Sequence, residues 1–232
     1  MSETTVPKER TTHFDTPAPI SVALDVAAGR IRFVAADRTD TVVEVLPADT
    51  AKSRDTKAAE QTRVAYDGGV LRIDGPQAKN QLLGPSGSVD ITVRLPAGSR
   101  VEAKATGAEL RGEGRLGDVV IEGAQGTVEL DEAASARLTV LAGDVSVGRL
   151  GGPAEISTQK GDIRVTEALR GRVTLRTEHG DIAVGAARGV SSLDAGTGYG
   201  RVHNTLKNTD GAAAGLTVHA TTAYGDITAR SL

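Results

Sequence analysis

Apolar and polar residues alternate along most of this chain, and glycines interrupt the alternation at nearly regular distances. Three segments show the unit clearly: TQKGDIRV (158–165), TEHGDIAV (177–184) and TAYGDITA (222–229). An alternation with a period of two is typical of β-strands that bury one face. The glycine between the two arms of each segment can adopt positive φ angles, so the pattern predicts strand, turn and strand.

The same unit recurs along the second half of the chain, marked by a glycine or, once, by an alanine. Aliphatic residues stand two positions after every marker, and apolar residues stand five and seven positions before it. The markers are Ala108, Gly126, Gly143, Gly161, Gly180, Gly200 and Gly225, at spacings of 17 to 25 residues. A repeat of this length is typical of solenoids. The sequence therefore predicts an all-β fold, a β-solenoid with coils of about 17–25 residues, in which each coil pairs in parallel with the next about 4.8 Å away.

We expect three regions. Residues 1–19 read as a disordered leader, 20–100 as an irregular N-terminal β-region continuous with the solenoid, and 101–232 as regular solenoid repeats. In the second region, Gly29 and Gly69 have apolar neighbours in the same frame, but segments 47–62 and 74–88 interrupt the pattern. A separate small β-sandwich is the alternative for this region.

Composition narrows the classes of function. The chain has no cysteine, which excludes disulfides, thiolate metal ligands and thiol catalysis. Its net charge of −3 gives no general attraction to nucleic acid or to anionic membranes. No stretch approaches the roughly 18 to 20 apolar residues of a membrane span. The first 20 residues lack the apolar region of a signal peptide, so we expect a cytoplasmic protein.

The segment ISVALDVAAGRIRFVAADRTDTVVEVLP (20–47), followed by the array of Gly-Asp-Val/Ile coils, resembles the DUF4097 β-strand-repeat family. That family is also labelled "putative adhesin" and is related to the toastrack domains. The resemblance extends from about Ile20 to Leu232. It implies a right-handed, single-stranded β-helix with no established enzymatic activity, and a link to membrane-stress systems of bacteria.

Two polar columns follow from the repeat. Asp144, Asp162, Asp181 and Asp226 come directly after the marker glycine, and Thr158, Thr177, Thr197 and Thr222 stand three positions before it. The aspartates could form a cation-binding ladder, but the nonapeptide of calcium-loaded β-rolls is absent. Asx-turn bonds to nearby backbone N–H groups are the favoured interpretation. The threonines are expected to hydrogen-bond within the stack, and we expect neither metal nor cofactor.

A third column lies directly before the marker glycine. His179 shares it with Lys160, Tyr199 and Tyr224, so this polar and aromatic column is expected to face outward. It is a candidate partner-binding stripe, with a solvated turn edge as the alternative. Leu82 and Leu83, in the irregular segment 74–88, are further candidates for partner binding, with capping of the core as the alternative.

No catalytic motif emerges, so we expect a non-enzymatic interaction or scaffold module with a protein partner, linked to envelope stress or to transport. The alternatives are a self-assembling structural protein similar to bactofilin, a surface adhesin, and a β-helix enzyme acting on carbohydrate. The sequence ends almost on a coil, in YGDITARSL (224–232), so Val218, Ala220 and Ile227 are expected near an open end of the stack. An open end favours self-association. The insertion 204–215, folded back as a lid, is the alternative.

Overall fold

The computed structural model describes residues 10–76, 87–187, 191–206 and 215–232. One helix lies in this part of the chain, α1 (Ser53–Gln61). The strands are β1 (Arg10–Asp15), β2 (Ser21–Ala36), β3 (Asp40–Pro47), β4 (Arg63–Asp67), β5 (Val70–Asp74), β6 (Val89–Pro96), β7 (Arg100–Gln125), β8 (Val128–Ala142), β9 (Val145–Leu150), β10 (Ala154–Lys160), β11 (Ile163–Ala168), β12 (Gly171–His179), β13 (Ile182–Ala186), β14 (Ser191–Tyr199), β15 (Val202–Thr205), β16 (Leu216–Tyr224) and β17 (Ile227–Ser231).

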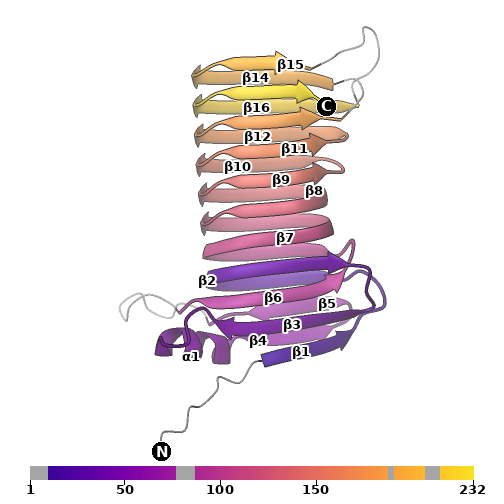
Figure 1. Cartoon of the computed structure of the whole chain (residues 1–232), viewed down its shortest axis with the longest axis vertical. Helices are drawn as coiled ribbons and strands as arrows, with labels where there is room; N and C mark the ends of the chain where they lie inside the picture. Colours follow the sequence, from indigo (N-terminus) through magenta and orange to yellow (C-terminus); the bar gives the residue numbers. More distant parts are fainter. Residues whose placement is uncertain (1–9, 77–86, 188–190, 207–214) are drawn as a thin grey trace, which may run out of the picture.

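The strands stack into a β-solenoid with two walls (Figure 1), as the repeat predicts. Each regular coil has two arms joined at the marker glycine, such as β10 and β11 around Gly161. First arms pair in parallel with first arms and second arms with second arms, in register: β10 lies between β8 and β12, and β11 between β9 and β13. Like positions of successive coils are therefore neighbours in space.

The core lies between the walls and is almost wholly aliphatic. In the coil of β12 and β13, Val173 and Leu175 of one wall and Ile182 and Val184 of the other are at most 2% exposed. These are the predicted inward positions, so the frame drawn from the sequence is confirmed for this coil. Apolar burial of this kind is the main force that holds parallel coils together, because an isolated coil has nothing to cover its apolar side.

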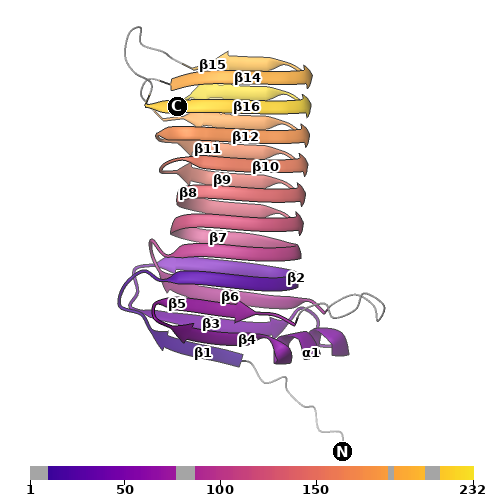
Figure 2. The ribbon, with the colours of Figure 1, turned by 180° about the vertical axis from the view of Figure 1, so that it is seen from behind.

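The coil order at the C-terminal end differs from the order in the sequence. β16 pairs with β12 on one edge and with β14 on the other, and β17 lies in the same way between β13 and β15. The last coil of the sequence is thus inserted beneath the one that precedes it, and β14 and β15 form the end of the stack (Figure 2).

The expectation that Val218, Ala220 and Ile227 lie near an open end is therefore wrong. All three are fully buried, because the coil of β14 and β15 covers them. The exposed counterpart of Ile227 is Val202, which is 42% exposed. The inward position two residues further holds an exposed asparagine, Asn204, as suits a coil with only one neighbour.

The N-terminal end shows a similar exchange of order. β2 pairs in parallel with β7 on one edge, and with β5 and β6 on the other. Beyond these strands the chain turns antiparallel: β3 pairs with β6, β1 with β3, and β4 with β5. The rings of Phe14 and Tyr66 meet there with centroids 5.3 Å apart, so β1 and β4 approach each other and close this end.

Two details of this region correct the sequence analysis. The sequence predicts residues 10–15 as part of a disordered leader, but they form β1, which the alternation of RTTHFD and the half-buried Phe14 explain. The repeat places Gly69 in the frame of the coil corners, but with Gly68 it forms the turn of the antiparallel hairpin β4–β5. Both glycines have positive φ angles, as a tight two-residue hairpin turn requires.

The interrupting segment 47–62 contains α1, which packs beside β3 and β6. The buried side of this helix carries the small residues Ala58 and Ala59. The carboxylate of Asp55 accepts a hydrogen bond from the backbone N–H of Ser88 at 3.0 Å. In the described part of the chain, no helix has the length and apolar character needed to cross a membrane. Leu82 and Leu83, and most of the insertion 204–215, lie outside the described residues.

Candidate functional site

The corner glycines bring successive coils into close contact. Gly180 has a φ angle of 152°, and a Cβ atom placed on it would lie 2.1 Å from the carbonyl oxygen of Gly161 in the coil below. Any side chain would therefore collide with backbone, and an L-residue would in addition be strained at this φ angle. The glycine is thus required twice over, and it fixes the residues just before and just after the corner in straight columns.

The aspartate column after the corner stabilises the stack. Each carboxylate Oδ1 accepts the backbone N–H of the equivalent residue in the next coil: Asp162 donates to Asp144 at 2.8 Å, Asp181 to Asp162 at 2.8 Å, Asp226 to Asp181 at 2.7 Å, and Arg201 to Asp226 at 2.8 Å. The bonds run between coils and not within a local Asx-turn, which corrects the expected partner. Arg201, which interrupts the column in sequence, stands in the last coil, where no further N–H needs an acceptor.

The threonine column lies on the inner side of the corner. Each hydroxyl donates to the carbonyl oxygen of the marker glycine in the adjacent coil, with Oγ1 to O distances from 2.9 to 3.3 Å. The four donors are Thr158, Thr177, Thr197 and Thr222, and their acceptors are Gly143, Gly161, Gly225 and Gly180. The predicted bonding within the stack is confirmed. These bonds satisfy corner carbonyls that would otherwise be left without a partner.

The column before the corner carries the candidate binding residues, and the structure brings them together. Lys160 is the register partner of His179, His179 of Tyr224, and Tyr224 of Tyr199. The ring centroids of His179 and Tyr224 lie 5.0 Å apart with planes 10° from parallel, and those of Tyr224 and Tyr199 lie 5.0 Å apart at 4°. We call these four residues the aromatic ridge. Their order in space could not be read from the sequence, because it follows the inserted coil.

The aromatic ridge lies at the surface. Tyr224 is 51% exposed and Tyr199 is 71% exposed. Because the rings stack on one another, the ridge presents ring edges, phenol hydroxyls and the imidazole to the outside, and a ring face only at Tyr199, where the row of rings ends. Lys160 forms no ion pair with any described residue, so its ammonium group is available as well.

The aspartate column runs beside the ridge and gives this corner an acidic character. Asp162 follows Lys160 by two residues, Asp181 follows His179, and Asp226 follows Tyr224. Each of these exposed carboxylates uses one oxygen for the bond to the next coil, and this bond leaves its other oxygen available to a ligand. The corner can therefore offer hydrogen-bond acceptors, phenol hydroxyls and one ammonium group along a straight line.

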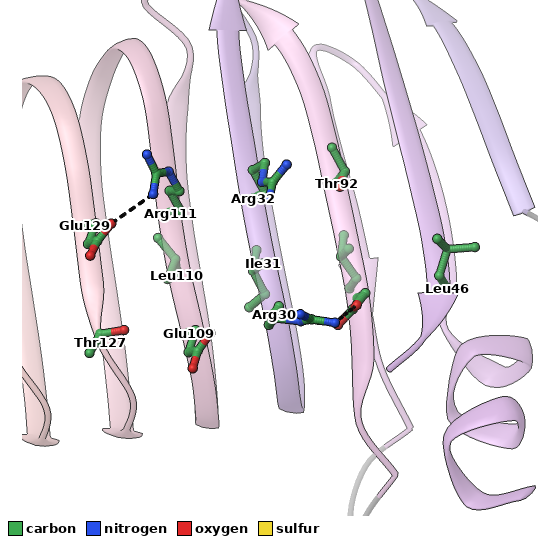
Figure 3. A pocket seen from close by; sticks show the side chains of 12 residues that line it. Arg30, Ile31, Arg32, Leu46, Thr92, Glu109, Leu110, Arg111, Thr127 and Glu129 are labelled. Atoms are coloured by element: carbon green, nitrogen blue, oxygen red, sulfur yellow. Dashed lines mark hydrogen bonds and ion pairs between the residues drawn. The ribbon is translucent and has the colours of Figure 1, made fainter. Parts of the chain in front are cut away.

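A shallow groove on the outer face of β2, β6, β7 and β8 is a second surface feature, which the sequence analysis did not identify (Figure 3). Its charges compensate one another. Arg30 pairs with Asp90, and Arg111 lies 3.2 Å from Glu129 and 3.1 Å from Glu113. The hydrogen bond from Arg30 to Asp90 raises the pKa of the guanidinium above its usual value. Three arginines and three carboxylates line the groove, so it has no net charge with which to attract an ionic ligand.

In the described residues, no group of three or more His, Asp or Glu side chains is placed to hold a metal ion. One histidine forms a His–Asp pair: Nδ1 of His219 lies 3.1 Å from Oδ2 of Asp194. Its Nε2 is covered and has no hydrogen-bond partner. This imidazole therefore does not present its second nitrogen to a substrate.

Comparisons with known proteins agree with this architecture. The model of the Toastrack DUF4097 family matches residues 22–231. No curated protein matches the chain. Among solved structures, a putative adhesin from Bacteroides fragilis is similar with a TM-score of 0.60 and 17% identity, over 97% of this chain and 98% of that one. A putative lipid binding protein from Parabacteroides distasonis has a TM-score of 0.47 and 11% identity, over 95% and 96% of the two chains.

The family match covers nearly the whole solenoid, including the coil of β2 and the inserted coil of β16 and β17. At 17% identity, the similarity to the Bacteroides fragilis protein concerns the fold alone. The stacked coils, the corner glycines and the family match lead to one conclusion: this chain belongs to the Toastrack DUF4097 family.

Proposed function

We propose that this protein is a non-enzymatic binding module and that the aromatic ridge contacts a protein partner. The observation that carries the proposal is the stacked row of His179, Tyr224 and Tyr199 on a rigid corner. Exposed tyrosines are common in protein interfaces, because they contribute a large area at a low cost in conformational entropy. Here stacking already restrains the rings, so binding orders little further.

The chemistry of the corner favours a partner segment with basic residues. Three carboxylates lie along the ridge, those of Asp162, Asp181 and Asp226. The ridge itself contributes one cation, the ammonium group of Lys160. A Lys or Arg side chain of the partner could pair with the free carboxylate oxygens while its neighbours accept hydrogen bonds from the phenols. Binding through exposed charges of this kind weakens as salt is added.

The geometry gives little support to catalysis, which is the reason to prefer binding. The groove on β2, β6, β7 and β8 is lined by mutually paired charges. The pair of His219 and Asp194 keeps its second imidazole nitrogen covered. The name of the Bacteroides fragilis protein, a putative adhesin, is that of a binding protein and agrees with the proposal.

The test is affinity capture from an extract of the organism that encodes the chain. The bait is the immobilised full chain, and the test variant combines Tyr199→Ala with Tyr224→Ala. Thr221→Ala is the matched control, since Thr221 is exposed on β16, three residues before Tyr224, but outside the ridge. We expect a protein captured by the wild type and by the control, lost with the double variant and released by salt. Equal capture by all three baits would refute a role for the ridge.

A further inference from the structure

The two ends of the solenoid are built differently. At the N-terminal end, antiparallel strands and α1 follow the last parallel coil, and Phe14 and Tyr66 meet across it. At the other end, β14 pairs with β16 only and β15 with β17 only, and no other described strand or helix lies on them. The stack therefore ends, in the described residues, on two bare strand edges (Figure 1).

The unpaired groups of the longer edge can be named. The backbone N–H of Gly171 donates to the carbonyl oxygen of Gly215 at 2.8 Å, and Gly171 is the register partner of Leu216, so Leu216 directs its own peptide groups to the other edge, toward β14. Leu216 is in register with Ser191, so the groups of Ser192, Asp194 and Gly196 bond to β16. Because successive residues of a strand direct their N–H and C=O groups to opposite edges, those of Leu193, Ala195 and Thr197 point away from the stack. An edge of this kind is a template for another strand.

Natural edges are usually protected by lysines, prolines or bulges. The described end coil, 191–206, contains no lysine and no proline. Its two formal charges, Asp194 and Arg201, are opposite in sign, so two copies of this end do not repel each other by net charge. Val202 at 42% exposure adds apolar surface, and the outer face of the Tyr199 ring has no described ring against it.

We infer that this end of the solenoid binds the same end of a second copy. Two edges must be satisfied at once: β14 and β15 belong to opposite walls, about 10 Å apart for two packed sheets, and they run in opposite directions along the coil. A single extended peptide covers only one such edge. The end coil of another copy offers both, and a twofold axis makes each contact antiparallel, which strands accept readily.

The same end is poorly suited to a head-to-tail filament. A further parallel coil would need an acceptor for its corner N–H, and Arg201 stands where the preceding coils have aspartate. In a head-to-tail filament, the N-terminal end of the next copy would have to continue the stack as a parallel coil. That end consists of antiparallel strands and does not have this shape. The association is therefore a closed dimer, and it does not depend on partner binding by the ridge.

The contact is small, so the dimer is weak and reversible. β14 has nine residues, which span about 30 Å, and with walls about 10 Å apart the end covers roughly 300 Å². Stable interfaces bury about 800 Å² per partner. Dimerisation is thus expected at high micromolar concentrations and not at nanomolar ones.

Ala195 provides a matched pair of variants. Ala195→Gly keeps the N–H on the open edge. Ala195→Pro removes that N–H and places the ring where a second strand would pair, while the bonds of the flanking residues Asp194 and Gly196 to β16 remain. Leu193→Pro, with Leu193→Ala as its control, repeats the test at another outward position and serves if Ala195→Pro does not fold.

The measurements are sedimentation velocity of the full chain over a wide concentration range and hydrogen exchange at the outward amides of β14. We expect concentration-dependent dimers for the wild type and for Ala195→Gly, and at least a tenfold higher dissociation constant for the folded proline variant. The outward amides should gain protection as concentration rises. A monomeric wild type would overturn the inference, whether its edge amides exchange freely or are protected by the chain itself. Dimers that form equally well with proline at 195 and 193 would also overturn it.

Discussion

Asp226 accepts the backbone N–H of Arg201 at 2.8 Å, although Arg201 comes 25 residues earlier in the chain. Every other link of the aspartate column runs from an earlier acceptor to a later donor. The reversal at this one link is the hydrogen-bond signature of the inserted coil, and it places Arg201 at the end of the ladder.

The inserted coil can be tested with two residues at the same position of the repeat. Ile227 and Val202 both stand two residues after a corner glycine, but Ile227 is fully buried and Val202 is 42% exposed. Ile227→Asp should unfold the protein, because an unpaired buried charge costs several kcal/mol. Val202→Asp should leave a folded protein with nearly unchanged stability. Thermal unfolding followed by circular dichroism distinguishes the two, and the opposite result would mean that the coils stack in sequence order.

The core frame predicts a similar sensitivity in the middle of the stack. Ile163 and Ile182 are at most 1% exposed, and they are register partners on the neighbouring parallel strands β11 and β13. Ile163→Asp and Ile182→Asp should each abolish cooperative unfolding near the wild-type temperature. Arg164→Ser, at the exposed neighbouring position, is the control. A wild-type melting curve for either buried variant would show that the frame is wrong.

The aspartate column should contribute to stability through its acceptor oxygen and not through its charge. Asp162→Ala removes the acceptor for the N–H of Asp181 and should cost about 1 kcal/mol. Asp162→Asn keeps a carbonyl oxygen at the same place and should cost less. Urea unfolding of the three proteins measures the difference, and equal losses for both variants would point to the charge instead.

Calcium should have no effect on the column. Each Oδ1 that would face a cation already accepts a backbone N–H. A site filled at 100 times its dissociation constant would add about 2.7 kcal/mol of stability, which a melting experiment detects easily. We expect the same melting temperature with saturating calcium and with chelator, and a clear rise with calcium would contradict a purely structural column.

Gly180 and Gly196 allow a test of the corner. Gly180→Ala places Cβ 2.1 Å from the carbonyl oxygen of Gly161, at a φ angle unfavourable to alanine, and should destabilise by well over 1 kcal/mol. Gly196→Ala meets no atom within 4 Å and should be neutral or stabilising. Urea unfolding compares them, and an equally tolerated alanine at 180 would mean that the coils can separate at the corner.

Much of this fold could be predicted because coils stacked in parallel and in register require similar residues at equivalent positions, which makes the repeat visible in the sequence. Corner glycines, inward aliphatic residues and the threonine column all follow from the repeat, and so did the alignment of Lys160 with His179. The coil order could not be predicted in the same way, since most coils present the same columns and like positions match whichever of these coils are neighbours. The signals were present, however: Arg201 in the aspartate column, Asn204 at an inward position, and a spacing of 25 residues after Gly200.

The N-terminal end was less predictable for a different reason. Alternation identifies a strand but not its direction, so the antiparallel β3 and the hairpin at Gly69 looked like further coils. The helix α1 has few large apolar residues and buries mainly alanines, which leaves a weak periodic signal.

The position of β16 and β17 has a consequence for synthesis on the ribosome. The coil of β14 and β15 leaves the ribosome first, and the exposed edge of β12 and β13 can accept it in register, because its columns match. That pairing is not the native one, and it must be avoided or undone before the final coil can take its place. The native order of this end can therefore form only after β16 and β17, which are translated later than β14 and β15, have also left the ribosome.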